Sequence, residues 1–265
     1  FYNMVDTIIV GQYLGEDALA AVGSTGCLMF LVLGFANGIA QGFGVMVSHA
    51  FGAKDFKLLK HYVALSLILT AIVSLLLTIP TVAASRQFLI LMKTPDNILG
   101  LADSYIKVIF AGILLTMSYN VASGILRGIG DSKTPLYFLV FSSVLNIILD
   151  IVFIVPMHMG VAGAAWATIL SQFLSAVFST VVGLRNFPIL HLRREDFHDL
   201  KGAAVLHLKT GFPMGFQMSV MCIGQLAMQA VVNSLGTAAV AGYTAASKAD
   251  QLSVLVNNAM MTAIS

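Results

Sequence analysis

Two carboxylic acids lie inside apolar runs that are long enough to cross a bilayer as helices. Asp6 comes six residues before Gln12, where a polar turn begins, and Asp150 comes six residues before Pro156, at the end of another run. Six helical residues span about 9 Å, so both carboxyl groups are expected at a similar depth below one membrane face. A charge inside a span costs about 3 kcal/mol on insertion scales, and each acid therefore needs a partner or a function.

Three uncharged polar side chains are predicted in the same layer. Asn146 precedes Asp150 by four residues and so shares its helix face. Thr168 and Tyr105 each lie eight or nine residues after an outer turn. Two neighbouring carboxylates in such a layer can hold a proton or coordinate a hard cation through oxygen. The alternative is that each residue only forms a hydrogen bond between packed helices.

Other polar residues in the apolar runs are candidates for lining a substrate cavity. They lie in the last two runs and are Gln217, Gln225, Lys248 and Asp250. Lys107, near Tyr105, could pair with an acid or extend its amine to the membrane surface. The six histidines show no spacing typical of a metal site. We expect no metal beyond a possible Na⁺ at Asp6 and Asp150.

Catalytic motifs are missing from the sequence. There is no phosphate-binding loop for ATP and no nucleophile elbow. We therefore expect no catalytic residue, no cofactor and no enzymatic activity. A net charge of +2 gives no reason to expect a nucleic-acid partner, and no obligate protein partner is indicated.

The composition predicts the elements that must position these residues. Hydrophobic residues make up 58% of the 265 residues and charged residues only 10%, whereas soluble domains carry about 25%. Mean hydropathy is +0.91. The period-two alternation of a membrane barrel is absent. The expected fold is therefore an all-α, polytopic transmembrane helical bundle in the lipid bilayer.

Polar turns divide the chain into eight apolar segments. Several segments exceed 25 residues and overrun a hydrocarbon core of about 30 Å, so they must tilt, kink or project. The predicted segments are 1–13, 18–51, 61–92, 97–126, 135–157, 160–184, 203–234 and 237–265.

Basic residues predict the orientation of these segments. Nine of the fourteen Lys and Arg residues lie in the turns after the second, fourth and sixth segments, whereas the odd turns hold only Lys93, with Arg86 nearby. Because basic turns stay on the cytoplasmic side, the even turns are predicted to be cytoplasmic. The nine residues are Lys54, Lys57, Lys60, Arg127, Lys133, Arg185, Arg193, Arg194 and Lys201.

An internal repeat predicts two lobes. A shift of 221 residues aligns the turn YLGEDALA with SLGTAAVA, and both turns end an odd segment, so the repeat is parallel. Two parallel six-helix lobes form a transporter architecture. We assign 1–184 to an N-lobe, 185–202 to a cytoplasmic linker and 203–265 to the start of a C-lobe. The chain begins and ends within apolar runs, and we interpret it as a fragment covering the first eight helices.

Several stretches resemble the multidrug and toxic compound extrusion (MATE) transporters of the MOP superfamily. They are MVDTIIVGQYLGEDALAAVG, HAFGAKD, RGIGDSKTP, and NIILDIVFI followed by GVAGAAWAT. The resemblance covers essentially the whole chain. It implies an antiporter that exports amphipathic, often cationic organic compounds in exchange for H⁺ or Na⁺. It also implies that the acidic cluster of the N-lobe is the cation-coupling site, which here matches Asp6, Asn146, Asp150 and Thr168, with Tyr105 a looser match.

One departure from the family pattern concerns the seventh helix. The vibrio-type subgroup has a glutamate there as part of a C-lobe cation site. Counted from Pro213, that position falls at or near Met221, and the segment 203–234 contains no acid. The repeat likewise places Ala227 opposite Asp6. The sequence is more similar to the DinF-like branch, in which the N-lobe acids dominate, and no C-lobe cation site is expected.

Two other functions compete with multidrug antiport. The first is a flippase for lipid-linked oligosaccharides or peptidoglycan precursors, which belongs to the same superfamily. Such flippases place several cations in the central cavity, whereas only Lys107 and Lys248 lie well inside the spans here. The second is a membrane-embedded enzyme or scaffold, which lacks motif support. The sequence therefore favours an ion-coupled exporter of small organic molecules in a bacterial cell membrane.

Overall fold

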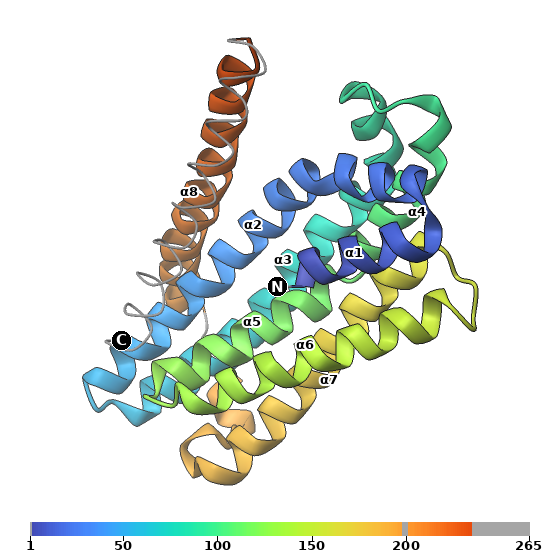
Figure 1. The fold of residues 1–265 in the computed structure, drawn as a ribbon. Coiled ribbons are helices and arrows are strands. Elements are labelled where there is room, and N and C mark those ends of the chain that lie inside the picture. Colours follow the sequence, from blue (N-terminus) through green and yellow to red (C-terminus); the bar gives the residue numbers. More distant parts are fainter. Residues whose placement is uncertain (1, 198–200, 235–265) are drawn as a thin grey trace.

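The computed structural model describes residues 2–197 and 201–234, which form helices joined by short turns (Figure 1). No β-strand occurs within these residues, and the predicted all-α fold is confirmed. The helices follow in the order α1 (Tyr2–Leu14), α2 (Glu16–Gly52), α3 (Phe56–Leu91), α4 (Asp96–Ala111), α5 (Ile113–Gly128), α6 (Lys133–Ile154), α7 (Val161–Asn186), the short 3₁₀ helices η1 (Pro188–Leu190) and η2 (Arg194–Phe197), and α8 (Lys201–Ser234).

Within residues 2–197 and 201–234, four helices are long and apolar enough to cross a membrane, namely α2, α3, α6 and α7. The helices α4 and α5 form a bent pair that would supply a fifth span. With 37 and 36 residues, α2 and α3 are each about 55 Å long. They exceed the thickness of a hydrocarbon core, as the segment lengths predicted. The chain is a helical membrane protein.

The predicted apolar segment 97–126 contains two helices, α4 and α5, with a kink between them. The chain bends by 46° between α4 and α5, at Gly112. A side chain at Gly112 would collide with Ile169 of α7. Just before the bend, the Thr78 hydroxyl of α3 donates to the Phe110 carbonyl at 3.3 Å. Glycine lets α7 approach closely here, and this tertiary contact is not visible in hydropathy. The predicted segment 237–265 lies outside the described residues.

Specific side chains start the helices at the basic turns. The Asp55 carboxylate accepts a hydrogen bond from the Leu58 amide at 3.0 Å and caps α3. Between α5 and α6, Gly130 has a φ of 90°, which glycine adopts without strain. The next residue, Asp131, accepts from the amides of Lys133 and Thr134, each at 3.1 Å. These local bonds make sharp turns that reverse the chain.

The turns after α2, α5 and α7 all lie at one end of the bundle, at the lower left and bottom of Figure 1. We call this end, made by the turns 52–55 and 129–132 and the linker 187–197, the basic end. The turns after α1, α3 and α6 lie at the opposite end. The basic end is the one predicted to be cytoplasmic.

Helix α8 packs antiparallel along α2 through glycines (Figure 1). A Cβ atom added at Gly38 would collide with the Met214 carbonyl, and one at Gly42 would lie 2.5 Å from the Gly211 Cα. Such contacts let two helix backbones approach closely without a polar partner. Farther along, Phe35 of α2 packs edge-on against Phe216, with ring centroids 5.3 Å apart.

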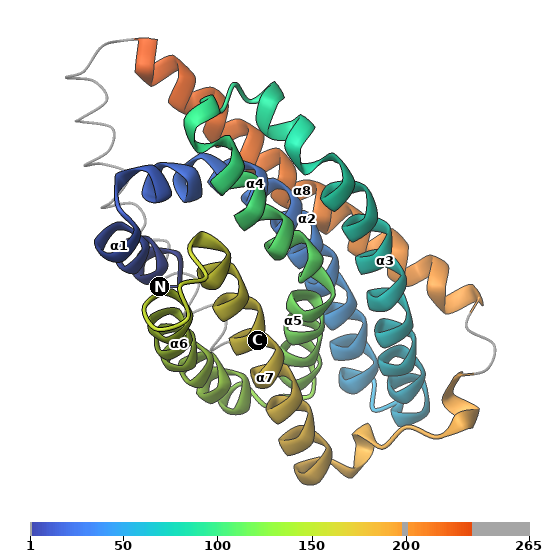
Figure 2. The same ribbon diagram turned by 90° about the vertical axis from the view of Figure 1, so that its right-hand side faces the viewer.

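A buried histidine adds a polar anchor to this contact. His207 of α8 is fully buried between α2 and α3. Its Nε2 lies 3.3 Å from the Ser66 hydroxyl of α3, and its Nδ1 lies 3.1 Å from the Ala203 carbonyl. Helix α8 is therefore fixed to both α2 and α3. The helices α1 and α6 lie side by side on the other side of the molecule, away from α3 and α8 (Figure 2).

Candidate cation site

Three helices bring the predicted polar residues together. Asp6 comes from α1, Asn146 and Asp150 from α6, and Thr168 from α7. The helix α1 packs against both α6 and α7, which pack against each other. Because Asn146 and Asp150 are one helical turn apart, both point from α6 toward the same neighbours. We call Asp6, Asn146, Asp150 and Thr168 the acid layer.

The Thr168 hydroxyl connects the three helices. It lies 3.1 Å from Asp6 Oδ2, to which it can donate, and it accepts from Asn146 Nδ2 at 3.4 Å. It also lies 3.1 Å from the Ala164 carbonyl of its own helix. A hydroxyl has one hydrogen, so Thr168 donates to Asp6 or to Ala164 but not to both at full strength. Rotation of the Thr168 hydroxyl alone therefore switches its hydrogen bond between Asp6 and Ala164.

The two carboxyl groups lie near each other. Asp6 and Asp150 are close enough to interact electrostatically. Their side chains are buried, with 1% and 0% of their surface exposed. Tyr105 of α4 is also buried and lies within electrostatic range of both acids. The five residues that the sequence grouped are thus in one region, with Tyr105 at its edge.

The acid layer is rich in acceptors that lack donors. Asp6 Oδ1, Asn146 Oδ1 and both oxygens of Asp150 are buried and receive no hydrogen bond from an amide or hydroxyl within the described residues. No Lys, Arg or His of the described ranges forms a salt bridge with either acid. Two buried negative charges without a counter-ion are costly. The site therefore suits a bound cation, either a proton or a metal ion held by oxygens.

The acid layer is closed to solvent. Both the Asp6 and the Asp150 carboxyl groups are shielded from water in this conformation. The reason is the close packing of α1 against α6 and α7. An ion could enter only after α1 moves relative to these helices.

A third buried acid, Asp103, was missed by the sequence reasoning. Asp103 of α4 accepts a hydrogen bond from Ser85 of α3 at 2.7 Å and forms a salt bridge with Lys107, also at 2.7 Å. Lys107 follows Asp103 by four residues, a spacing that places both on one helix face. Of the two alternatives predicted for Lys107, the salt bridge confirms pairing with an acid.

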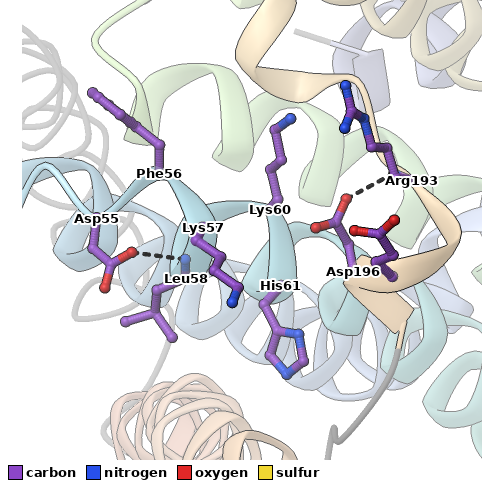
Figure 3. Close-up of a pocket in the computed structure, with 9 residues that line it drawn as sticks. Asp55, Phe56, Lys57, Leu58, Lys60, His61, Arg193 and Asp196 are labelled. Atoms are coloured by element: carbon purple, nitrogen blue, oxygen red, sulfur yellow. Dashed lines mark hydrogen bonds between the residues drawn. The ribbon is translucent and has the colours of Figure 1, made fainter.

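The described part of the structure does not form the predicted substrate cavity. Gln217 and Gln225 lie exposed on α8, whereas Lys248 and Asp250 lie outside the described residues. A cavity of about 540 Å³ occurs instead at the basic end (Figure 3). It lies between the start of α3 and the linker, and its lining carries both charge signs. On the linker side of the cavity, the Arg193 backbone amide donates to the Asp196 carboxylate of η2 at 2.7 Å.

Comparison with known proteins adds independent evidence. The profile of the MatE family matches residues 1–152. Over 99% of its length the chain is 34% identical to the "Probable multidrug resistance protein YpnP" of Bacillus subtilis, of which it covers 59%.

Two solved structures share the fold. A MATE protein in the bent conformation superposes with a TM-score of 0.87 at 30% identity, covering 95% of this chain and 56% of that protein. A MOP superfamily transporter from Pyrococcus furiosus, described by the reverse polarity of its binding pocket, superposes with a TM-score of 0.88 at 30% identity. That match covers 98% of this chain and 58% of the transporter. The chain thus spans somewhat more than half the length of the relatives it matches, and it belongs to the MATE family of transporters.

Proposed function

We propose that the protein containing this chain is a secondary antiporter that exports amphipathic, often cationic organic compounds and uses an inward H⁺ or Na⁺ gradient. The observation that carries the proposal is the acid layer, where two neighbouring carboxyl groups have no cationic side chain beside them. The name of the Bacillus relative supports multidrug resistance as the biological role. The expected location is the cell membrane, with the basic end in the cytoplasm.

The mechanism follows from the charge of the acid layer. A H⁺ or Na⁺ bound between Asp6 and Asp150 lowers their combined charge from −2 to −1, removes their mutual repulsion and allows α1 to pack against α6 and α7, as it does here. Loss of the cation leaves two carboxylates that repel each other and need water. The empty site therefore favours a conformation in which α1 is displaced. Ion binding at one site thus shifts an equilibrium between two conformations of the protein.

Substrate export requires that the same change of conformation exposes the substrate site first to one membrane face and then to the other. A shift from mostly one form to mostly the other needs about 5.5 kcal/mol of differential binding. Neutralisation of a buried carboxylate pair is of this order, because breaking a buried charge pair costs about 3–5 kcal/mol. We propose that the helices beyond residue 234 complete the substrate cavity, with Lys248 and Asp250 among its residues.

The proposal is tested with the full-length protein in proteoliposomes. Substrate efflux is measured with a pH gradient alone, a Na⁺ gradient alone and no gradient. Accumulation against a substrate gradient is expected with one ion only, and the ion that drives it is the coupling ion. Transport that proceeds equally well without a gradient would contradict antiport. Flipping of a fluorescent lipid-linked sugar in the same vesicles, without drug efflux, would instead establish the flippase alternative.

A further inference from the structure

Buried polar atoms without a partner are concentrated in one part of the molecule. Within the described residues, all such side-chain atoms lie on α1, α5, α6 and α7. Four of them belong to the acid layer. The others are the hydroxyls of Ser123, Ser142, Ser175 and Ser179, of which the last three are 0% exposed and the first 4%.

These four serines differ from other hydroxyl residues in the same helices. A serine inside a helix commonly donates to a carbonyl one turn earlier, and this bond is formed elsewhere in the chain. Ser143 donates to Leu139 at 2.9 Å, and Ser171 donates to Thr168 at 2.9 Å. The four serines form no such bond. Their hydroxyl groups are therefore available for another partner.

On α6 and α7 the unpartnered serines continue from the acid layer toward the basic end. Ser142 lies one turn below Asn146 on the same face of α6. On α7, Ser175 and Ser179 lie two and three turns below Thr168 on one side of the helix. The two helices run antiparallel and are joined at Asn146 and Thr168. The serines of both helices therefore occupy their shared interface.

Helix α5 completes the column. It runs parallel to α7, and the Thr116 hydroxyl donates to Gln172 Oε1 at 2.7 Å. The same offset of 56 residues places Ser123 level with Ser179. The polar groups of α5, α6 and α7 thus lie at successive depths over about three helical turns, or roughly 16 Å. We call the side chains of Ser123, Ser142, Ser175 and Ser179 the serine column.

We propose that the serine column binds a chain of water molecules that carries protons from the acid layer to the basic end. Buried polar groups in proteins are bonded to protein or to ordered water, and a buried water forms about three hydrogen bonds. The serine hydroxyls can each donate one bond and accept others, which a water chain requires. The inference rests on the proposed antiport and specifies the route by which the coupling proton leaves.

The proton balance along this route is simple. The Asp150 carboxyl releases a proton to the first water, and that water passes a different proton to the next. Each hydroxyl accepts one hydrogen bond and donates another, and no serine changes its charge. One proton enters the water at the basic end for each proton that Asp150 loses. No co-reactant is needed.

The column is closed at the basic end by two leucines. A Cβ atom added at Gly183 of α7 would lie 2.9 Å from Leu126 Cδ2 and 3.7 Å from Leu190 Cδ1. Both leucines are buried, and Leu190 belongs to η1 in the linker.

Cysteine accessibility tests the water chain in the full-length protein after its native cysteines are replaced by alanine. Ser142→Cys and Ser175→Cys are compared with Ser143→Cys, which is at the same depth but bonded to its own helix. A small charged thiol reagent is added to vesicles of either orientation. We expect Ser142→Cys and Ser175→Cys to react at least tenfold faster than Ser143→Cys, only in the orientation in which Lys133→Cys reacts. Leu190→Ala should increase both rates.

The same vesicles show whether the proposed water chain or the proposed antiport is wrong. Equal rates at Ser142→Cys and Ser143→Cys, or no reaction at either, would overturn the water chain, as would transport driven by Na⁺ alone. Ser179→Ala should slow proton-driven efflux severalfold without changing substrate affinity, and wild-type efflux would also overturn it. If Asp150→Asn still pumps normally, the proposed antiport is wrong. If Asp150→Asn is inactive but the serine column is unreactive, only the water chain is wrong.

Discussion

Asp103 and Asp150 are both carboxylic acids buried among apolar helices, but their neighbours differ. Asp103 has a hydroxyl donor in Ser85 and a cation in Lys107, each 2.7 Å away. Asp150 lies near a second carboxyl group, that of Asp6. A carboxylate that is paired with a cationic side chain does not need to bind a cation from solution. A pair of acids without one is stable only when it binds a cation.

The comparison distinguishes the two acids by their neighbours and not by their positions in the sequence. Both acids lie on helices that line the same bundle, and both are largely shielded from solvent. What differs is whether the protein itself supplies the positive charge. If this interpretation is right, changes at Asp150 should alter ion coupling, whereas changes at Asp103 should alter stability.

The largest effect is expected from Asp150→Asn. Asparagine has nearly the same volume but can neither release a proton nor offer a charge to a cation. Uphill efflux in proteoliposomes should fall to background, while binding of the substrate remains measurable by equilibrium dialysis. The dependence of that binding on the coupling ion should also disappear, because linkage needs a group whose ion occupancy differs between states. Wild-type transport by a well-expressed variant would refute the coupling role of Asp150.

A smaller effect is expected from Thr168→Val, which keeps the shape of the side chain. The change removes the hydroxyl that Asp6 and Asn146 share. A hydrogen bond to a charged group contributes about 1.5–3 kcal/mol and here stabilises the ion-free carboxylate of Asp6, so its loss should raise the apparent affinity for a coupling proton about tenfold or more. The half-saturating ion concentration for transport measures this. Thr180→Val, on an exposed face of the same helix, should leave the value unchanged.

Lys107→Met tests the other side of the comparison. It leaves Asp103 without its counter-ion, but the Lys107 side chain is 46% exposed, so solvent replaces part of the lost interaction. The variant should be less stable by about 1 kcal/mol, seen as a lower melting temperature in detergent. Transport per folded molecule should stay within about twofold of wild type. A double variant with Asp103→Asn should recover part of the stability. Loss of ion coupling in Lys107→Met would instead show that Asp103 takes part in ion binding.

The smallest effect is expected from Met221→Ala. Met221 is exposed on α8 and provides no ion ligand. Transport with an imposed ion gradient should remain close to wild type, with an unchanged ion dependence. A strong loss of coupling would show that the seventh transmembrane segment takes part in ion binding, contrary to the absence of acids between residues 203 and 234.

Much of the fold was predictable because it depends on local features. The turns at Asp55 and Asp131 are set by side chains that cap the next helix. The long apolar runs require helices in lipid, since a helix satisfies its own backbone hydrogen bonds. The bend at Gly112 was not predictable, because it depends on Ile169, more than fifty residues away.

The candidate site was predictable only in part. Equal depth below one membrane face follows from counting residues along a helix, and this grouped Asp6, Asn146, Asp150 and Thr168. Whether their helices are neighbours depends on packing. The serine column was not predicted, because a serine that bonds to its own helix and one that does not look identical in sequence. The assignment of a coupling role to the acid layer remains a proposal.

The sequence by itself determined the helical class, the length of the apolar spans, the charge difference between the two ends and the depth of each polar group. These features depend on composition and on periodicity along one helix. Only the tertiary structure decided that Asp103 has a hydroxyl donor from another helix and that Asp150 lies near Asp6. The reason is that burial and contacts between helices are set by neighbours distant in sequence, whereas the pairing of Asp103 with Lys107 is local to one helix.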